Sequence, residues 1–361
     1  MSERGQTFGR EAVEIADFVT GAEIMQLTSA PLFSVNLYFE HNSFLGDDRS
    51  LLLLSQRYPG RGVPWDLFRI DEDGRNLTQL TDEKHPLGHP IPAWEGRLIY
   101  GFRKNVLISL DPDTFEETEI ACCDEATGFG ACTLSGDGRY FFAVCTLKDG
   151  TSAIARLDTD GKEVVTMCHG LPYNHIVANP GRPEFTFSGK GTPEHHQGVR
   201  VCDDDGTNVR FFSFQRFAHC AWLGRTGRMQ GTLLPPEHAV TSIASDETEP
   251  TVIARGGPYF WHSAATADAK WIVADTNWPD QGVQLIHVES GRYGCLCKTL
   301  GSNGDWTHPH PSFNRKGTKV VFASDRTGLP QVYLVTVPDH LREEIGTGTL
   351  TRRQRWVGHV I

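Results

Sequence analysis

Two histidines separated by one proline offer the clearest chemistry in this 361-residue chain. They lie in residues 305–311, which read Asp-Trp-Thr-His-Pro-His-Pro. The two prolines fix φ and keep the segment from becoming helix, so we expect an extended backbone. Side chains two residues apart on an extended backbone point to the same side. The spacing therefore predicts that the imidazoles of His308 and His310 lie side by side, just before a strand.

A polar turn and an apolar run follow this pair at residues 312–325, and the same pattern recurs along the chain. Each copy has a polar or histidine-containing start, an Asp/Asn-Gly turn, an apolar strand, a second strand ending in Asp, a glycine turn and a last strand. The copies start about 40 to 48 residues apart, which is the period of four-stranded propeller blades. We expect blades that start near residues 36, 85, 128, 173, 217, 260 and 306.

The segment at residues 23–28 resembles a blade-ending strand, although no blade precedes it. The seventh copy lacks its own last strand before Pro338. A strand at residues 23–28 would complete that blade and close the ring, which removes two exposed sheet edges. The sequence thus predicts an all-β fold, a single seven-bladed β-propeller over residues 1–361 closed by an N-terminal strand. We expect residues 1–20 and 341–361 to be appendages that form short helices; an open sandwich or two domains are the alternatives.

Histidines recur at one phase of the repeat. Six of the seven copies place one a similar distance before the first apolar strand: His41, His89, His175, His219, His262 and the pair His308/His310. In a propeller the innermost strands start at one mouth of the central channel, so we expect these histidines to converge in one funnel. A single histidine is more often a hydrogen-bonded loop residue, but this many at one phase favours a shared site. His41 and His89 are expected to line the funnel rather than to act as catalysts.

A metal site is expected where two neighbouring copies meet. His262 joins His308 and His310 to give three imidazoles, and Asp305 is in reach as a fourth ligand. Three nitrogens and one oxygen, with positions left open, suit a divalent transition ion such as Mn, Fe, Ni or Zn. The matching position of His262 one repeat earlier is what turns an H-x-H pair into a metal-site prediction.

These residues give the chain a resemblance to a known family. From residue 37 to residue 335 it resembles the oligogalacturonate lyases, most sharply at residues 174–175, around His219, at His262 ahead of residues 270–275, and at residues 308–311. The resemblance implies a TolB-type seven-bladed propeller, a cytoplasmic location and a Mn²⁺ site. In the family, three histidines and a glutamine three residues before the H-P-H pair hold the metal. His262, His308 and His310 match that set, whereas Asp305 occupies the glutamine position.

The resemblance also implies catalytic roles. The family's catalytic histidine matches His219, and its active-site arginine falls on Arg200, although the segment between the two differs in length. A uronate lyase removes the C5 proton beside the carboxylate and expels the sugar at C4. His219 would be the base, Arg200 would pair with the carboxylate, and His175 would orient the sugar or protonate the leaving oxygen. Without the family resemblance, Arg200 fits equally well a salt bridge to Asp203 or Asp204.

Composition and charge limit the partners and the compartment. The net charge of −11 and the lack of a Lys/Arg cluster argue against nucleic acid or an anionic membrane. No apolar run approaches the roughly 18 residues of a membrane span, and the first residues do not resemble a signal peptide, so we expect a cytoplasmic protein. Nine scattered cysteines without a CxxC…CxxC framework indicate buried thiols in a reducing compartment. A structural zinc site at residues 122–123 or 295–297 is the lesser alternative.

Two other functions fit the same residues. A non-catalytic propeller resembling the TolB-type modules would scaffold protein partners, but the shared histidines argue against it. A metal-dependent uronate isomerase or epimerase would use the same C5 proton chemistry. Bound metal separates an enzyme from a scaffold, and the ultraviolet absorbance of a conjugated unsaturated uronate separates a lyase from an epimerase. The partner that we expect is a small acidic oligosaccharide, while the oligomeric state is not predicted.

Overall fold

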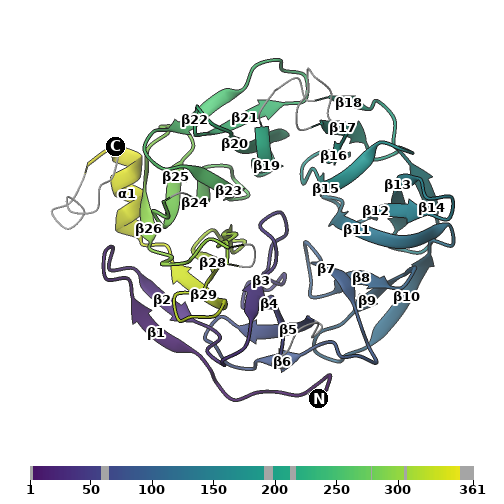
Figure 1. Ribbon diagram of the computed structural model, residues 1–361, viewed down its shortest axis with the longest axis horizontal. Helices are drawn as coiled ribbons and strands as arrows, with labels where there is room; N and C mark the ends of the chain where they lie inside the picture. The colour runs from purple at the N-terminus through teal and green to yellow at the C-terminus, as the bar shows by residue number, and fades with distance from the viewer. Residues whose placement is uncertain are drawn as a thin grey trace.

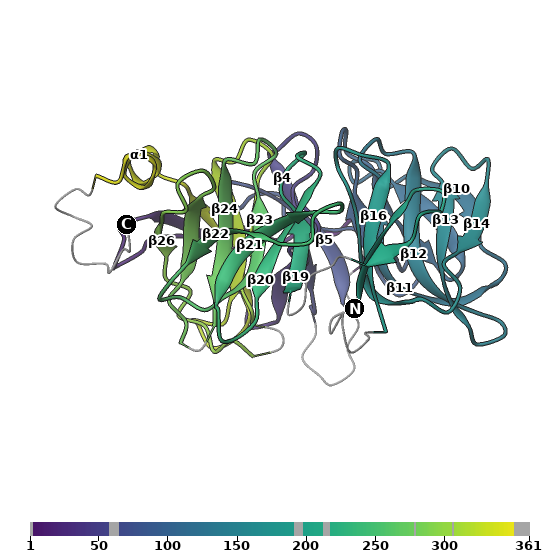
Figure 2. The ribbon, with the colours of Figure 1, turned by 90° about the horizontal axis from the view of Figure 1, so that it is seen from above.

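Seven antiparallel sheets surround a central channel in the computed structural model (Figure 1). The structure describes residues 3–57, 65–190, 198–211, 217–277, 279–304 and 307–349. Seen from the side, the blades form a flat disc, with their strands crossing its thickness (Figure 2). The predicted all-β, seven-bladed propeller closed by an N-terminal strand is confirmed. No helix in this part of the chain is long and apolar enough to cross a membrane.

The first three blades each contain four strands, ordered from the channel outward. Blade one is β3 (Ser34–Asn36), β4 (Ser50–Ser55), β5 (Asp66–Asp71) and β6 (Thr78–Gln79). Blade two is β7 (Gly88–Pro92), β8 (Ile99–Arg103), β9 (Val106–Leu110) and β10 (Glu117–Cys122). Blade three is β11 (Ala126–Leu134), β12 (Tyr140–Leu147), β13 (Ser152–Asp158) and β14 (Val164–Met167).

The next three blades repeat this order. Blade four is β15 (Pro172–Ala178), β16 (Glu184–Gly189), β17 (Val199–Asp203) and β18 (Arg210–Phe211). Blade five is β19 (Phe217–Trp222), β20 (Arg228–Leu233), β21 (Ala239–Ala244) and β22 (Thr251–Arg255). Blade six is β23 (Phe260–Ala265), β24 (Trp271–Thr276), β25 (Val283–His287) and β26 (Tyr293–Cys297).

The seventh blade joins the two ends of the chain. It holds β27 (Ser312–Phe313), β28 (Lys319–Ser324), β29 (Gln331–Thr336), β2 (Glu23–Gln26) and β1 (Val13–Ala16). Ile24 of β2 lies opposite Val335 of β29 and is 2% exposed. Burying such a side chain contributes about 1.5–3 kcal/mol, so β2 closes the ring by packing as well as by hydrogen bonds.

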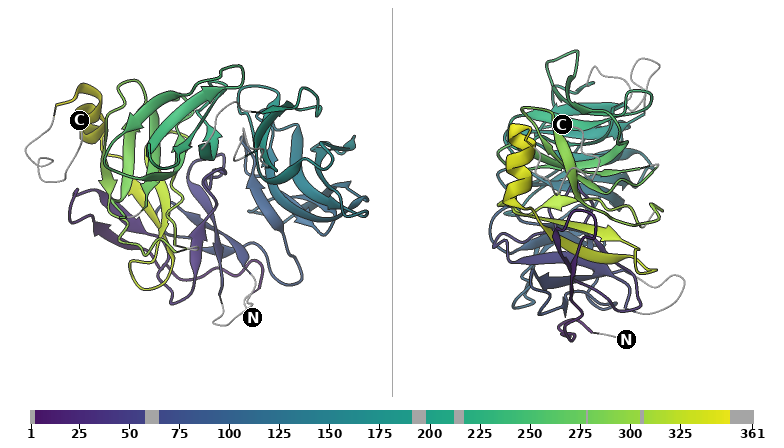
Figure 3. Two further views of the ribbon diagram at one scale, coloured as in Figure 1. Left: turned by 45° about the horizontal axis from the view of Figure 1, so that its top comes forward. Right: turned by 90° about the vertical axis from the view of Figure 1, so that its left-hand side faces the viewer.

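Residues 3–20 form no helix, contrary to our expectation for residues 1–20, and β1 pairs with β2 as a fifth, outermost strand. The turn between them is held by Asp17, whose Oδ1 accepts the main-chain N–H groups of Val19 and Thr20 at 3.0 and 2.7 Å. At the other end, α1 (Asp339–Thr347) lies on the rim of the disc (Figure 3). Its buried side chains Leu341 and Ile345 join the hydrophobic cluster of the last two blades.

The core lies between neighbouring blades rather than in one centre. Both faces of a blade are covered, so a middle strand is buried on both sides and reads as an unbroken apolar run. β4 is an example, because Leu51, Leu52 and Leu53 are all fully buried although successive side chains point to opposite faces. The nine cysteines are unpaired thiols and six of them are buried, while Cys122 is exposed.

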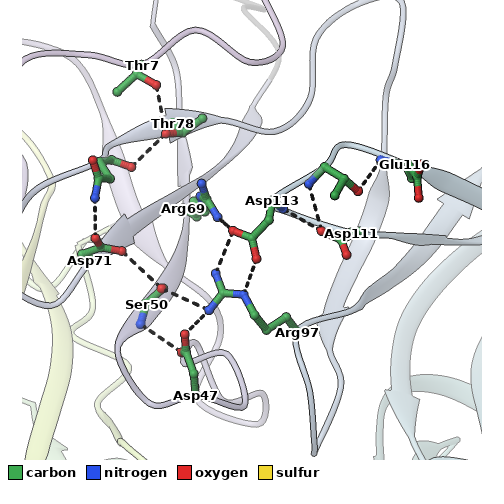
Figure 4. Close-up of polar contacts among 12 residues, drawn as sticks. Thr7, Asp47, Ser50, Arg69, Asp71, Thr78, Arg97, Asp111, Asp113 and Glu116 are labelled. Carbon is green, nitrogen blue, oxygen red and sulfur yellow. Dashed lines mark hydrogen bonds and ion pairs between the residues drawn. The ribbon is translucent and has the colours of Figure 1, made fainter.

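Ion pairs add a polar link between the first two blades (Figure 4). The guanidinium of Arg97 bridges Asp47 of blade one and Asp113 of blade two, and its Nε lies 2.6 Å from Asp113 Oδ2. Arg69 of β5 donates to the same Asp113 carboxylate. This network lies where β3 and β7 end, on the face of the disc opposite the starts of the innermost strands.

Candidate metal centre and the surrounding channel

Three histidines from two adjacent blades meet at one mouth of the channel. One ligand nitrogen from each of His262, His308 and His310 lies within 4.8 Å of the others. The ring of His262, on β23, is 4.2 Å from that of His310 and 5.3 Å from that of His308, centroid to centroid. The structure thus brings these three sequence-predicted ligands together. Asp305, expected as a fourth ligand, lies outside the described residues.

A buried carboxylate that the sequence analysis missed holds two of these histidines. Asp275, 1% exposed at the end of β24, accepts the main-chain N–H of His262 at 2.6 Å and that of His310 at 3.2 Å. Its Oδ2 also lies 2.9 Å from Nδ1 of His262. Burial raises the pKa of Asp275, while the charge of His310 and the main-chain N–H of His262 oppose that shift. The ionised carboxylate only accepts hydrogen bonds, so in that form Nδ1 of His262 carries the proton and Nε2 keeps a free lone pair. The sequence signal for Asp275 was its place at the end of residues 270–275, one of the segments over which the chain resembles the family.

The environment keeps the imidazoles in the form that a metal requires. Burial, together with the neighbouring imidazoles, holds the pKa values of His262 and His310 well below the usual range for histidine. Neutral imidazole is the ligand form, since a protonated ring has no lone pair to give. The rings of Tyr38 and Phe39 pack 4.7 Å from His310 and 5.1 Å from His262 and shield them from solvent. Three converging imidazoles, one of them oriented by a carboxylate, fit a divalent transition ion.

His219 lies beside this cluster on the innermost strand of blade five. Its ring centroid is 4.5 Å from that of His262 and 4.2 Å from that of Trp261. Burial and the neighbouring His262 lower the pKa of His219 to about 3. The ring is therefore neutral at neutral pH and keeps a free lone pair, although burial makes it a weaker base than an exposed imidazole.

Several of the predicted histidines share an unusual backbone conformation with positive φ. His89, His175, His219 and His310 have φ of 53°, 48°, 53° and 44°, in the left-handed region. The first three lie where the register of an innermost strand shifts by a β-bulge. Such a conformation costs a non-glycine residue about 1–3 kcal/mol, and bulges re-aim side chains near functional sites. The repeated cost indicates that the side-chain direction at this position matters.

His175 is paired with a second residue that the sequence analysis missed. Its Nδ1 lies 3.0 Å from Oε1 of Glu40, which belongs to the loop between β3 and β4 and crosses the channel from blade one to blade four. The Glu40 side chain is 4% exposed, whereas that of His175 is 42% exposed. The hydrogen bond to Glu40 raises the pKa of His175, while burial raises that of Glu40 against the opposing effect of His175. The two side chains therefore share a proton, and His175 is the member of the pair that is exposed to the channel.

Arg200 lies apart from the histidine cluster in its described contacts. It is on β17, the third strand of blade four, and is 8% exposed. Its guanidinium donates to the carbonyls of Gly198 and Lys190 at 2.9 and 3.1 Å and lies 4.3 Å from the Phe211 ring centroid. Two main-chain carbonyls thus bind the Arg200 guanidinium, which the family resemblance predicted to bind the substrate carboxylate.

His41 does not share the position of the other histidines, contrary to expectation. It follows β3 instead of preceding or opening an innermost strand, and it lines a cavity at the opposite end of the channel. Burial lowers its pKa to about 4. His89 lies in β7, with Nε2 3.2 Å from the carbonyl oxygen of Phe129 in blade three. His41 lies as far before β4 (from Ser50) as His219 lies before β20 (from Arg228), so it keeps the phase of the repeat. Because β3 already ends at Asn36, His41 lies in the following loop instead of in the strand.

Known proteins resemble this chain over nearly its whole length. It is 23% identical over 382 residues to an oligogalacturonide lyase of Pectobacterium atrosepticum, covering 90% of this chain and 95% of the relative. An oligogalacturonate lyase of Dickeya dadantii is 23% identical over 377 residues, with the same coverage. A solved oligogalacturonate lyase in complex with manganese superposes with a TM-score of 0.80 at 19% identity, and one from Vibrio parahaemolyticus with 0.79 at 19%. Each structural match covers 94% of this chain and all of the other. No family model matches the chain.

Proposed function

We propose that this protein is a metal-dependent lyase that cleaves 4-linked uronic-acid oligosaccharides of the oligogalacturonate type by β-elimination. The observation that carries the proposal is the meeting of three imidazoles, with ligand nitrogens within 4.8 Å of one another, beside a fourth imidazole at one mouth of the channel. The similarity to oligogalacturonate lyases over 90% of the chain supports it. The partner is a small acidic oligosaccharide. Unpaired thiols throughout the chain support a cytoplasmic location.

His262, His308 and His310 would hold the divalent ion, with Asp305 as the fourth ligand. Mn²⁺ is the ion that we propose, in line with the manganese complex of the structural relative, and Zn, Ni or Fe would suit the same nitrogens. When bound, the ion supplies a Lewis acid that neutralises the substrate carboxylate and makes the C5 proton more acidic.

His219 is the proposed base. Its neutral ring lies beside His262, so a sugar whose carboxylate lies at the metal centre has its C5 proton near this imidazole. A correctly placed general base contributes about 10²–10⁴-fold to the rate. Arg200 is proposed to form an ion pair with a substrate carboxylate. For this, its guanidinium must give up the hydrogen bond to the Lys190 carbonyl.

His175 is proposed to orient the sugar and protonate the leaving O4. Glu40 accepts the hydrogen of Nδ1, so Nε2 is the nitrogen available to substrate. The raised pKa of His175 favours the protonated ring, which is the form that an acid needs. His219 and His175 thus have pKa values displaced in opposite directions, as a base and an acid in one site require.

Incubation of the purified protein with oligogalacturonate tests the proposal. Elimination creates a conjugated double bond that absorbs in the ultraviolet, and the absorbance should rise with time. A uronate isomerase or epimerase working from the same histidines would change the sugar without that absorbance, and a scaffold would leave it unchanged. Either of these outcomes would contradict the lyase proposal.

A further inference from the structure

A cavity of about 430 Å³ lies at the mouth of the channel opposite the histidine cluster. Its walls come from the ends of the innermost strands and the turns that follow them, whereas the metal histidines lie at the starts of those strands. All seven blades contribute. The volume is within the usual range for small-molecule sites, about 300–1,000 Å³.

The loop between β3 and β4 extends into the middle of the ring of blades (Figure 1), and residues of this loop line the cavity. Tyr38, at the start of the loop, packs against His310 and His262. His41, three residues later, lines the cavity together with Asn42 and Gly46. The two chambers therefore share one wall, and a ligand in the cavity would not contact the metal ligands.

Two arginines and several carboxylates lie at the cavity. Arg225 and Arg315 line it, and the acidic lining residues are Glu95 and Glu40, of which Glu40 is engaged by His175. Burial lowers the pKa of Arg315, Asp48 and Glu95 oppose that shift, and the charge of Arg225 adds to it. Asp48 is engaged by the main-chain N–H groups of Arg315 and Lys316 at 2.7 and 3.1 Å, so the guanidinium groups of Arg225 and Arg315 remain the cationic donors that a carboxylate in the cavity would meet.

Buried polar atoms in the lining also lack partners within the described residues. Ser312 is 3% exposed, lines the cavity, and has no hydrogen-bond partner for its Oγ. The Nε of Arg315 is likewise buried without a partner, although Nη2 donates to the Ala93 carbonyl at 2.7 Å. Buried polar atoms are normally satisfied, so these two donors are available to a polar group of a ligand in the cavity.

The remaining walls are aromatic and apolar. Trp94 and Trp222 line the cavity, and their indole N–H groups are bonded to the carbonyls of Leu134 and Val177 at 3.4 and 3.0 Å. The rings are therefore fixed, with Ile91 beside them. Such walls favour a ligand with a flat or apolar body.

We propose that this opposite mouth binds a second ligand, a small organic anion whose carboxylate lies near Arg225 and Arg315 and whose ring or apolar body packs against the two tryptophans. The site is distinct from the metal centre and does not depend on the proposed lyase activity.

Calorimetric titration of the full chain with 2-naphthoate tests this site, with 2-naphthamide as the uncharged counterpart. Naphthoate should bind at one site per chain, and the amide at least about tenfold more weakly, because one ion pair that is partly desolvated is worth roughly 1.4 kcal/mol. Arg225→Gln should weaken naphthoate by a similar factor. Arg182→Gln, an exposed arginine outside the cavity lining, is the matched control and should bind like the parent.

A His308→Ala/His310→Ala variant should retain naphthoate binding, since neither residue lines the cavity. No saturable binding up to millimolar concentration, equal affinity for acid and amide, or an Arg225→Gln variant that matches its control would each overturn the proposal. Loss of binding in the double histidine variant would place the ligand at the metal centre instead, and would also overturn it.

Discussion

Replacing Asp275 by Asn should weaken metal binding without unfolding the propeller. The carboxylate accepts three hydrogen bonds, from the main-chain N–H groups of His262 and His310 and from Nδ1 of His262. An amide has the same shape, but only one of its two ends accepts. If the amide nitrogen faces Nδ1, the imidazole must adopt the other tautomer, with its proton on Nε2, where the metal should bind. If it faces the main chain, His262 loses the short hydrogen bond that fixes its backbone.

Either orientation costs metal affinity. Losing a partner of this kind typically weakens metal binding by about 10- to 100-fold, which is about 1.4–2.7 kcal/mol. A buried hydrogen bond left unmade costs about 1–3 kcal/mol of stability, so the melting temperature should fall while the protein still folds.

Titration of metal-stripped protein with Mn²⁺ in competition with a chromophoric chelator measures this affinity without any activity assay. Asp268→Asn is the matched control, because Asp268 is an exposed acid in the same blade whose Oδ1 accepts from Thr266 and Lys270, which an Asn can also do. If Asp275→Asn binds Mn²⁺ as tightly as the parent and the control, the carboxylate does not orient the metal ligand.

Three further changes test other parts of the account. His219→Asn should retain metal but lose about 10²–10⁴-fold in turnover; a rate near that of the parent would move the base elsewhere. Glu40→Gln should lower the pKa of His175, because the hydrogen bond that raises it is weakened, so the alkaline limb of the kcat/KM profile should shift to lower pH; an unshifted limb would rule out this acid. Deleting residues 1–28 removes the strands that close the ring and should therefore lower the melting temperature. A melting temperature equal to that of the full chain would show that closure is unimportant.

The sequence predicted the propeller because its period is local. Each blade is one run of about 40 to 48 residues, and the Asp-Gly turns and apolar runs repeat within it. The strand at residues 23–26 was also predictable, since the seventh copy visibly lacked its last strand. β1 was not, because only one of its four residues is even half-buried and its sequence has no core-facing pattern. A strand added to an exposed edge leaves little hydrophobic signal.

The candidate site was predictable where it depended on the phase of the repeat. His262, His308 and His310 meet because blades six and seven are neighbours both in the sequence and in space. Glu40 could not be found in this way, because its partner His175 lies 135 residues away across the channel. The spacing of residues in the sequence also could not predict that the Arg200 guanidinium donates to two main-chain carbonyls.

The central claim is that three histidines hold a divalent ion required for β-elimination. The most direct test is the rate at which unsaturated product appears, by ultraviolet absorbance, when oligogalacturonate is given to metal-stripped protein before and after reloading with Mn²⁺. We expect no rise before reloading, a steady rise after it, and none in a His308→Ala/His310→Ala variant treated in the same way. A stripped protein as fast as the reloaded one, or a variant that still forms product, would contradict it.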